Sequence, residues 1–144
     1  IKDSFIEELK RSGRYTYVDD QSDMEIDVTI KHLSMTAPVR KSGNFIFALY
    51  AFAYSQGYYA GPAQVLITAD AVLKKDGREI FKQEIGGIGR SGMLQGPRLR
   101  IGDFTTAMIE ALSLSVKNLN ENIVREVNIR ADAAMQDVTA CVGC

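Results

Sequence analysis

The sequence has little of the chemistry from which metal and redox sites are built, with one histidine and two cysteines in 144 residues. A zinc site needs four ligands, and His32 with Cys141 and Cys144 supplies three. A redox-active Cys-x-x-Cys motif is normally found at a helix N-terminus, whereas Cys-Val-Gly-Cys closes this sequence. We favour a disulfide between Cys141 and Cys144. Free thiols are the first alternative, and a metal or redox site is the second.

An excess of charge of either sign is also absent. The 17 basic and 18 acidic residues leave a net charge of −1, which gives no reason to expect nucleic acid as a partner. The hydrophobic content of 46% predicts one globular domain over residues 1–144 with a core of its own. The chain starts at Ile1, and no basic and apolar leader precedes its first helical pattern. Any targeting signal is therefore expected upstream of Ile1.

The longest gap in charge runs from Ser42 to Ala69, where no Asp, Glu, Lys or Arg occurs. Its apolar core, Phe45 to Tyr54, has ten residues and is too short for a membrane-spanning helix of about 20. We interpret it as a strand buried on both sides or as an aromatic surface covered by a neighbouring subunit. The alternative is a surface that contacts a membrane or an apolar, lipidic ligand. The candidate contact residues are seven of the twelve aromatics: Phe45, Phe47, Tyr50, Phe52, Tyr54, Tyr58 and Tyr59.

The clearest structural pattern is a β-hairpin over Ala63 to Gly87. Apolar residues alternate along its first half, and Asp76-Gly77 supplies the backbone that a tight turn needs. A three-residue turn with a bulge would place Phe81 and Ile85 opposite Ala71 and Ile67. We prefer this register to that of a two-residue turn, because it matches apolar residues better.

The rest of the pattern indicates an α+β fold, with a mostly antiparallel sheet of four or five strands and two helices packed on one face. A helix is expected up to Ser12, where Gly13 ends it, followed by a short strand at residues 14–18 and a clean strand at Met24–Lys31. Asp103 is predicted to cap a long helix whose buried stripe is weakened by asparagines in its second half. From Asn128 onward the pattern fades into a tail, residues 128–144, that we expect to be loosely ordered. A short strand at Val127 and Ile129 and a helix over Ala131–Val138 are possible within it. The stripe comprises Phe104, Met108, Ala111, Leu112, Val116, Leu119 and Ile123.

Two motifs suggest ligand chemistry, and neither has the right context. Gly87, Gly89 and Gly92 match Gly-x-Gly-x-x-Gly, but the preceding strand belongs to a hairpin and the next helix starts more than ten residues later. A flexible glycine-rich connection is favoured there. The acidic cluster at residues 19–23 lacks the glycine and closing glutamate of a calcium loop. With no nucleophile and base at a readable spacing, we expect no enzymatic activity, no catalytic residues, no cofactor and no bound metal.

Several stretches resemble small bacterial envelope lipoproteins. FIEELKRSGRYTYVDD (Phe5 to Asp20) resembles their first helix and strand. MEIDVTI followed by VLITADAVLKKDGREIFKQEIGG resembles their sheet, in which a variable strand leads to a hairpin with an Asp-Gly turn. TTAMIEALSLSVKNL resembles their closing helix. The relatives are lipoproteins of curli secretion (CsgG type), Pel polysaccharide export (PelC type) and lipopolysaccharide assembly (LptE type), and auxiliary lipoproteins of envelope ABC transporters.

This resemblance implies a function and a location. The chain would be a non-enzymatic, periplasm-facing domain at the outer membrane, held by a lipid on a cysteine upstream of Ile1. It would serve secretion, export or envelope assembly by binding copies of itself or an envelope partner.

Overall fold

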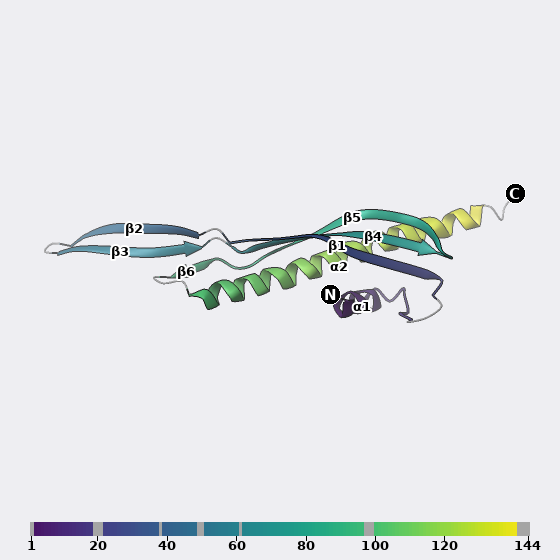
Figure 1. Cartoon of the computed structure of the whole chain (residues 1–144), viewed down its shortest axis with the longest axis horizontal. Helices are drawn as coiled ribbons and strands as arrows, with labels where there is room; N and C mark the ends of the chain where they lie inside the picture. The colour runs from purple at the N-terminus through teal and green to yellow at the C-terminus, as the bar shows by residue number, and fades with distance from the viewer. Residues whose placement is uncertain are drawn as a thin grey trace. The chain divides into compact units, whose positions relative to one another are not determined.

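The computed structural model describes the backbone of residues 2–18, 22–37, 39–48, 51–60, 62–96 and 100–140, and the side chains of these residues outside 39–60, 94–96 and 134–140. The described strands form two three-stranded sheets, in the orders β1-β4-β5 and β2-β3-β6. The predicted α+β class is confirmed, whereas a single sheet of four or five strands is not. In chain order the elements are α1 (Lys2–Arg11), β1 (Met24–Thr36), β2 (Val39–Ala48), β3 (Ala51–Ala60), β4 (Gln64–Lys75), β5 (Arg78–Arg90), β6 (Leu94–Gly96) and α2 (Ile101–Ala140) (Figure 1).

The chain divides into two compact units, which are described separately. The first unit comprises residues 1–33, 67–87 and 116–144, and the second comprises residues 34–66 and 88–115. Parts of β1, β4, β5 and α2 therefore belong to each unit. The single domain expected from the composition stays a prediction.

In the first unit, the sheet β1-β4-β5 has one buried and one wet face. Every second residue of β4 is buried, including Ile67, Ala69, Ala71 and Leu73, as the alternation predicts. On the wet face, Lys74 Nζ lies 2.6 Å from Asp27 Oδ2, and Lys31 Nζ lies 2.9 Å from Asp70 Oδ2. Residue numbers rise along β1 as they fall along β4, so these two ion pairs identify the strands as antiparallel.

The turn between β4 and β5 differs from our preferred register. β4 ends at Lys75 and β5 begins at Arg78, and both turn residues have positive φ, 49° at Asp76 and 73° at Gly77. This is a two-residue turn, so the predicted three-residue turn is wrong. Asp-Gly favours the two-residue form because both residues tolerate positive φ.

The four apolar residues of the predicted match are nevertheless all buried. Phe81 and Ile85 are buried, as are Ile67 and Ala71. A two-residue turn pairs odd-numbered with even-numbered residues, yet all four buried residues are odd-numbered. The pairing must therefore shift by one residue between the turn and Phe81, as a β-bulge does.

Helix α2 packs on this sheet through a row of buried residues four positions apart. In the first unit the row is Leu119, Ile123, Val127 and Ala131. Polar contacts flank it, because Asn122 Nδ2 donates to the Gly86 carbonyl at 2.8 Å and the Arg130 guanidinium lies 5.5 Å from the centre of the Phe81 ring. Asn122 therefore fastens the helix to β5 where we expected asparagines to weaken the stripe.

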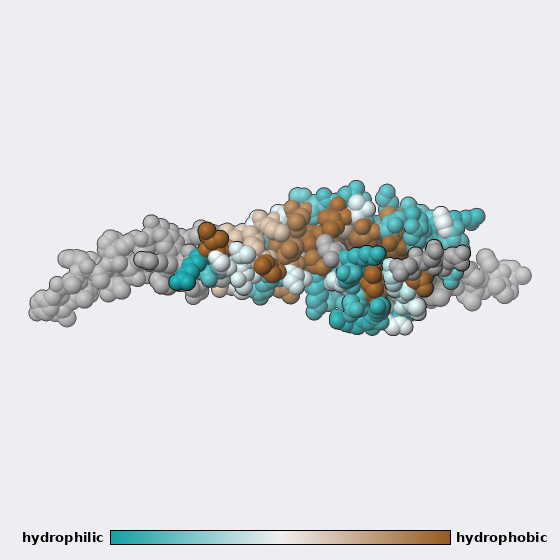
Figure 2. Space-filling view, turned by 60° about the horizontal axis from the view of Figure 1, so that its bottom comes forward, coloured by the Kyte–Doolittle hydropathy of each residue, from teal (hydrophilic) through white to brown (hydrophobic). Residues whose placement is uncertain are grey.

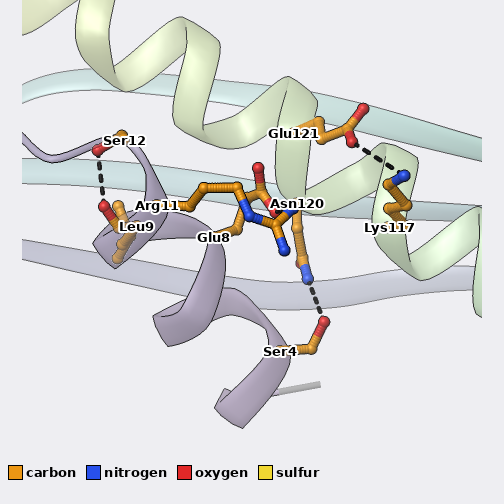
Figure 3. Close-up of polar contacts among 8 residues, drawn as sticks. All are labelled: Ser4, Glu8, Leu9, Arg11, Ser12, Lys117, Asn120 and Glu121. Carbon is orange, nitrogen blue, oxygen red and sulfur yellow. Dashed lines mark hydrogen bonds and ion pairs between the residues drawn. The ribbon is translucent and has the colours of Figure 1, made fainter.

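Helix α1 is held against α2 by a second asparagine. Asn120 is 2% exposed, and its Nδ2 donates to Ser4 Oγ at 3.0 Å (Figure 3). Leu9 is the buried residue of α1, and Ser12 Oγ donates to its carbonyl at 2.6 Å. Gly13 follows with φ 67°, so the predicted helix stop is confirmed. Residues 14–18 continue without strand structure, which makes the short strand predicted there wrong.

The ends of α2 also correct the sequence analysis. The helix begins at Ile101, and Asp103 lies inside it, where its Oδ2 accepts from the Arg100 N–H at 2.8 Å. Asp103 thus satisfies the helix start from the third helical position and is not the N-cap residue. At the other end α2 runs unbroken to Ala140. The helix over 131–138 is confirmed, and the short strand at Val127 and Ile129 is wrong.

The predicted stripe of α2 is right in part. Ala111, Leu119 and Ile123 are buried, whereas Phe104, Met108, Leu112 and Val116 are half-buried. The buried positions of α2 in the second unit are the small residues Ala107, Ala111 and Ser115. Small side chains line this part of the helix because the backbone of β5 approaches it closely at Gly89.

Candidate association surface on the β2–β3 hairpin

The uncharged segment forms an antiparallel pair of strands in the second unit (Figure 1). Ten residue pairs join β2 to β3 without interruption, from Val39 with Ala60 to Ala48 with Ala51. Residues 39–43, which precede the aromatic positions, belong to β2 as well. Tyr50 lies outside the described residues.

The register sorts the aromatic residues by face. Residues directly opposite each other in a sheet share a face, and the face alternates along each strand. Phe47 pairs with Phe52, and Phe45 pairs with Tyr54. We call the face to which the register assigns Phe45, Phe47, Phe52, Tyr54 and Tyr58 the aromatic face.

The opposite face is built from small residues. Asn44 pairs with Ser55, Ile46 with Ala53, and Ala48 with Ala51. Of the predicted contact residues that the structure describes, only Tyr59 is assigned to this small-residue face, near the strand base, where it pairs with Arg40. The hairpin therefore has two chemically different faces, which the composition of the segment alone does not reveal.

The edges of the hairpin are covered unequally. β6 pairs with β3 over three residues, Tyr58, Tyr59 and Ala60. β2 stands at the end of its sheet, so among the described strands it has a neighbour on one side only. Every second residue of an edge strand turns its N–H and C=O away from the sheet, where they are available to another strand.

The edge strands of the two sheets differ in charge. β1 carries Glu25, Asp27 and Lys31, and β5 carries Arg78, Glu79, Lys82, Glu84 and Arg90. Charged side chains of this kind protect an edge from pairing with other chains. β2 carries Arg40 and Lys41 at its start and no charge from Ser42 to Ala48. It is therefore the edge strand with the longest uncharged stretch among those described.

The glycine run at residues 86–92 packs against a helix. It continues β5 as far as Arg90, so the flexible connection that we favoured is wrong. A Cβ atom on Gly89 would overlap the carbonyl oxygen of Ala111 and the backbone nitrogen of Ser115. The strand ends in a backbone hydrogen bond from Ser91 to Ala63, 2.9 Å long. Gly89 thus lets β5 and α2 approach closely in the second unit.

The described residues give no other obvious place for chemistry. His32 is exposed on β1, and no group of three or more His, Cys, Asp or Glu side chains within the described part of the chain could hold a metal ion. Cys141 and Cys144 lie outside the described residues, as do Asp19 and Asp20.

Apolar residues also reach the surface away from the hairpin (Figure 2). The most exposed of them are on α2, where Ile101 is 87% and Ile109 is 62% exposed. These exposed residues make α2 the main alternative to the hairpin as an association surface. None of the helices in the described ranges is sufficiently long and apolar to cross a membrane.

Comparisons with protein families, curated proteins and solved structures found no match to this chain.

Sequence reasoning missed the hairpin because its reversal has no turn signal. No Gly, Pro, Asn or Asp occurs between Phe45 and Tyr54, and these are the residues that mark tight turns. The available signal was the approximate mirror symmetry of the sequence, since Phe-x-Phe-Ala is followed two residues later by Ala-Phe-Ala-Tyr.

Proposed function

We propose that this chain is a non-enzymatic association domain that binds copies of itself or an envelope partner through the β2–β3 hairpin. In the cell it would act as a periplasm-facing part of a lipoprotein in secretion, export or envelope assembly, as the resemblance implies. The aromatic face would provide the main contacts.

One observation carries this proposal. The pairing register brings five aromatic residues to one face of a hairpin that has no charged residue after Lys41. Aromatic side chains give large contact areas for little loss of conformational freedom, and they are enriched at interfaces. A charged residue within such a surface opposes its burial, and among the described residues of this face the register assigns only Lys41, which pairs with Tyr58 near the strand base.

The test is the association state of a variant with a charge on the aromatic face. Phe47→Asp should weaken self-association about thirtyfold, the effect of losing an aromatic anchor worth about 2 kcal/mol. Sedimentation velocity over a range of protein concentrations measures this change. Circular dichroism and thermal unfolding establish that the variant is folded, and Phe47→Ser serves if the aspartate prevents folding.

Ile109→Asp is the matched control, since it places the same charge on the exposed apolar part of α2. It should associate like the wild type. If Ile109→Asp lowers association and Phe47→Asp does not, the interface lies on α2 and the proposal is wrong.

A folded monomeric wild type that takes up an apolar probe would favour the alternative function, a binder of an apolar or lipidic ligand. Loss of probe binding in the Phe47→Asp variant would place that site on the hairpin.

A further inference from the structure

We infer that the β2 edge pairs with β2 of a second copy, in antiparallel orientation, to form a closed dimer with two-fold symmetry. This inference rests on the proposed function and specifies both its partner and its contact. It concerns the backbone edge of the hairpin, whereas the proposed function concerns its aromatic face.

The choice of β2 over β3 follows from the pairing of the second sheet. β6 occupies the outer edge of β3 at Tyr58, Tyr59 and Ala60, whereas β2 stands at the end of the sheet over its full ten residues. A strand added to β2 therefore meets no described neighbour. Strand addition of this kind satisfies the outward N–H and C=O groups and gives affinity through main-chain hydrogen bonds.

The choice of a second copy follows from the absence of repulsion. The edge strands β1 and β5 carry charges along their length, so a copy of either would bring charged side chains together. Between Ser42 and Ala48, β2 brings none.

The antiparallel orientation follows from the position of Arg40 and Lys41. In a parallel pair the cations of both copies would be neighbours. In an antiparallel pair with aligned strand centres, the two Lys41 residues lie about six residues apart, or about 20 Å along the strands. This exceeds the screening length of about 8 Å at physiological salt, so the cations do not oppose the pairing.

The antiparallel pair also has a consequence for the faces. A two-fold axis perpendicular to the sheet keeps the aromatic faces of both copies on the same side of the sheet. Paired residues of the two β2 strands then have numbers that add up to an even sum, so each lies opposite a residue of the same face. The strands β3-β2-β2-β3 would form one four-stranded sheet, in which the aromatic faces of both copies are continuous. One dimer would therefore present twice the aromatic surface of a single chain to a further partner.

The test uses two positions that the structure pairs directly, Asn44 on β2 and Ser55 on β3. Both belong to the small-residue face, so a lysine at either one leaves the aromatic face unchanged. Asn44→Lys should weaken dimerisation about fivefold or more, since it puts like charges near the centre of the strand pair. Ser55→Lys, one strand further from the β2 edge, should dimerise like the wild type.

A mixture gives the sharper result. Asn44→Lys and Asn44→Glu should each be weak dimers alone, and mixing them should restore a dimer that contains both chains. Sedimentation velocity with one variant fluorescently labelled measures this, in reducing buffer so that Cys141 and Cys144 form no disulfides between copies.

The outcomes separate the inference from the proposed function. If Phe47→Asp abolishes association while Asn44→Lys and Ser55→Lys do not, the proposed function stands and edge pairing is wrong. Equal loss in Asn44→Lys and Ser55→Lys would place the contact on the small-residue face and would also overturn edge pairing. A monomeric wild type would overturn edge pairing and would restrict the proposed function to binding an envelope partner.

Discussion

At the scale of single residues, Gly89 is a position at which the fold leaves no room for a side chain. The backbone of α2, at the Ala111 oxygen and the Ser115 nitrogen, occupies the space that a side chain on Gly89 would need. Gly89→Ala forces these backbones apart, and we expect it to lower the free energy of unfolding by about 3 kcal/mol, at the upper end for an overpacked site. Urea unfolding measures the loss.

Gly92→Ala is the control for this prediction. A Cβ atom on Gly92 has no neighbour within 4 Å, and its φ is not in the left-handed region. This variant should change the free energy of unfolding by about 0.5 kcal/mol or less. Similar losses in both variants would mean that the close approach of β5 and α2 is not what constrains Gly89.

The ion pairs on the wet face of the sheet predict a loss of stability at alkaline pH. A hydrogen bond with Asp70 raises the pKa of Lys31, and a hydrogen bond with Asp27 raises the pKa of Lys74. Burial raises the pKa of Tyr15 in the same direction. The folded state thus holds these protons more tightly than the unfolded state. Their contribution is complete below pH about 10 and is lost as the pH rises through the folded pKa values.

We therefore expect the urea midpoint to fall as the pH is raised above about 10. Replacing both Lys31 and Lys74 with arginine keeps the charges and removes their titration, so the double variant should lose less stability over the same range. An equal fall in wild type and double variant would assign the alkaline transition to other groups.

At the scale of elements, the buried row of α2 gives a prediction within one helix. Leu119 is fully buried, whereas Leu114 is 39% exposed. Leu119→Ala leaves a cavity and should cost about 2–5 kcal/mol, and Leu114→Ala should cost less than about 1 kcal/mol. Chemical denaturation of the two variants provides the comparison. Equal costs would place both leucines in similar surroundings, contrary to the packing described.

The elements also show which parts of the fold were predictable. The position of the β4–β5 hairpin was predicted correctly, although the length of its turn was not, because alternation and an Asp-Gly turn are local signals. The predicted buried stripe of α2 was partly wrong because we assigned large side chains, such as Phe104 and Met108, to the buried positions. Close approach at Gly89 buries small ones instead, and this contact joins residues more than twenty positions apart.

The candidate surface was predictable only in composition. The uncharged, aromatic character of residues 45–59 is visible in the sequence, but the division into two faces depends on the pairing register. That register follows from a reversal between Ala48 and Ala51 that no turn residue marks. The difference between the β2 and β3 edges depends in addition on β6, which pairs with β3 from more than thirty residues further along the chain.

At the scale of the whole molecule, the proposed function predicts a location. Metabolic labelling of the full-length precursor with a fatty acid should place lipid on a cysteine upstream of Ile1, and the protein should be recovered with the outer membrane. As a control, replacing Cys141 and Cys144 with serine should leave the label in place. An unlipidated protein in the cytosolic fraction would remove the envelope function and leave the association domain to be explained otherwise.

The pairing of β2 with β3 also sets a rule for changes in length. Because the face alternates with every residue, inserting or deleting one residue in β3 would transfer Phe52 and Tyr54 to the side of Ala48 and Ala51. Changes of two residues would lengthen or shorten the hairpin and leave its two faces intact. Natural variants of this hairpin that keep its contact surface should therefore differ in length by even numbers within each strand.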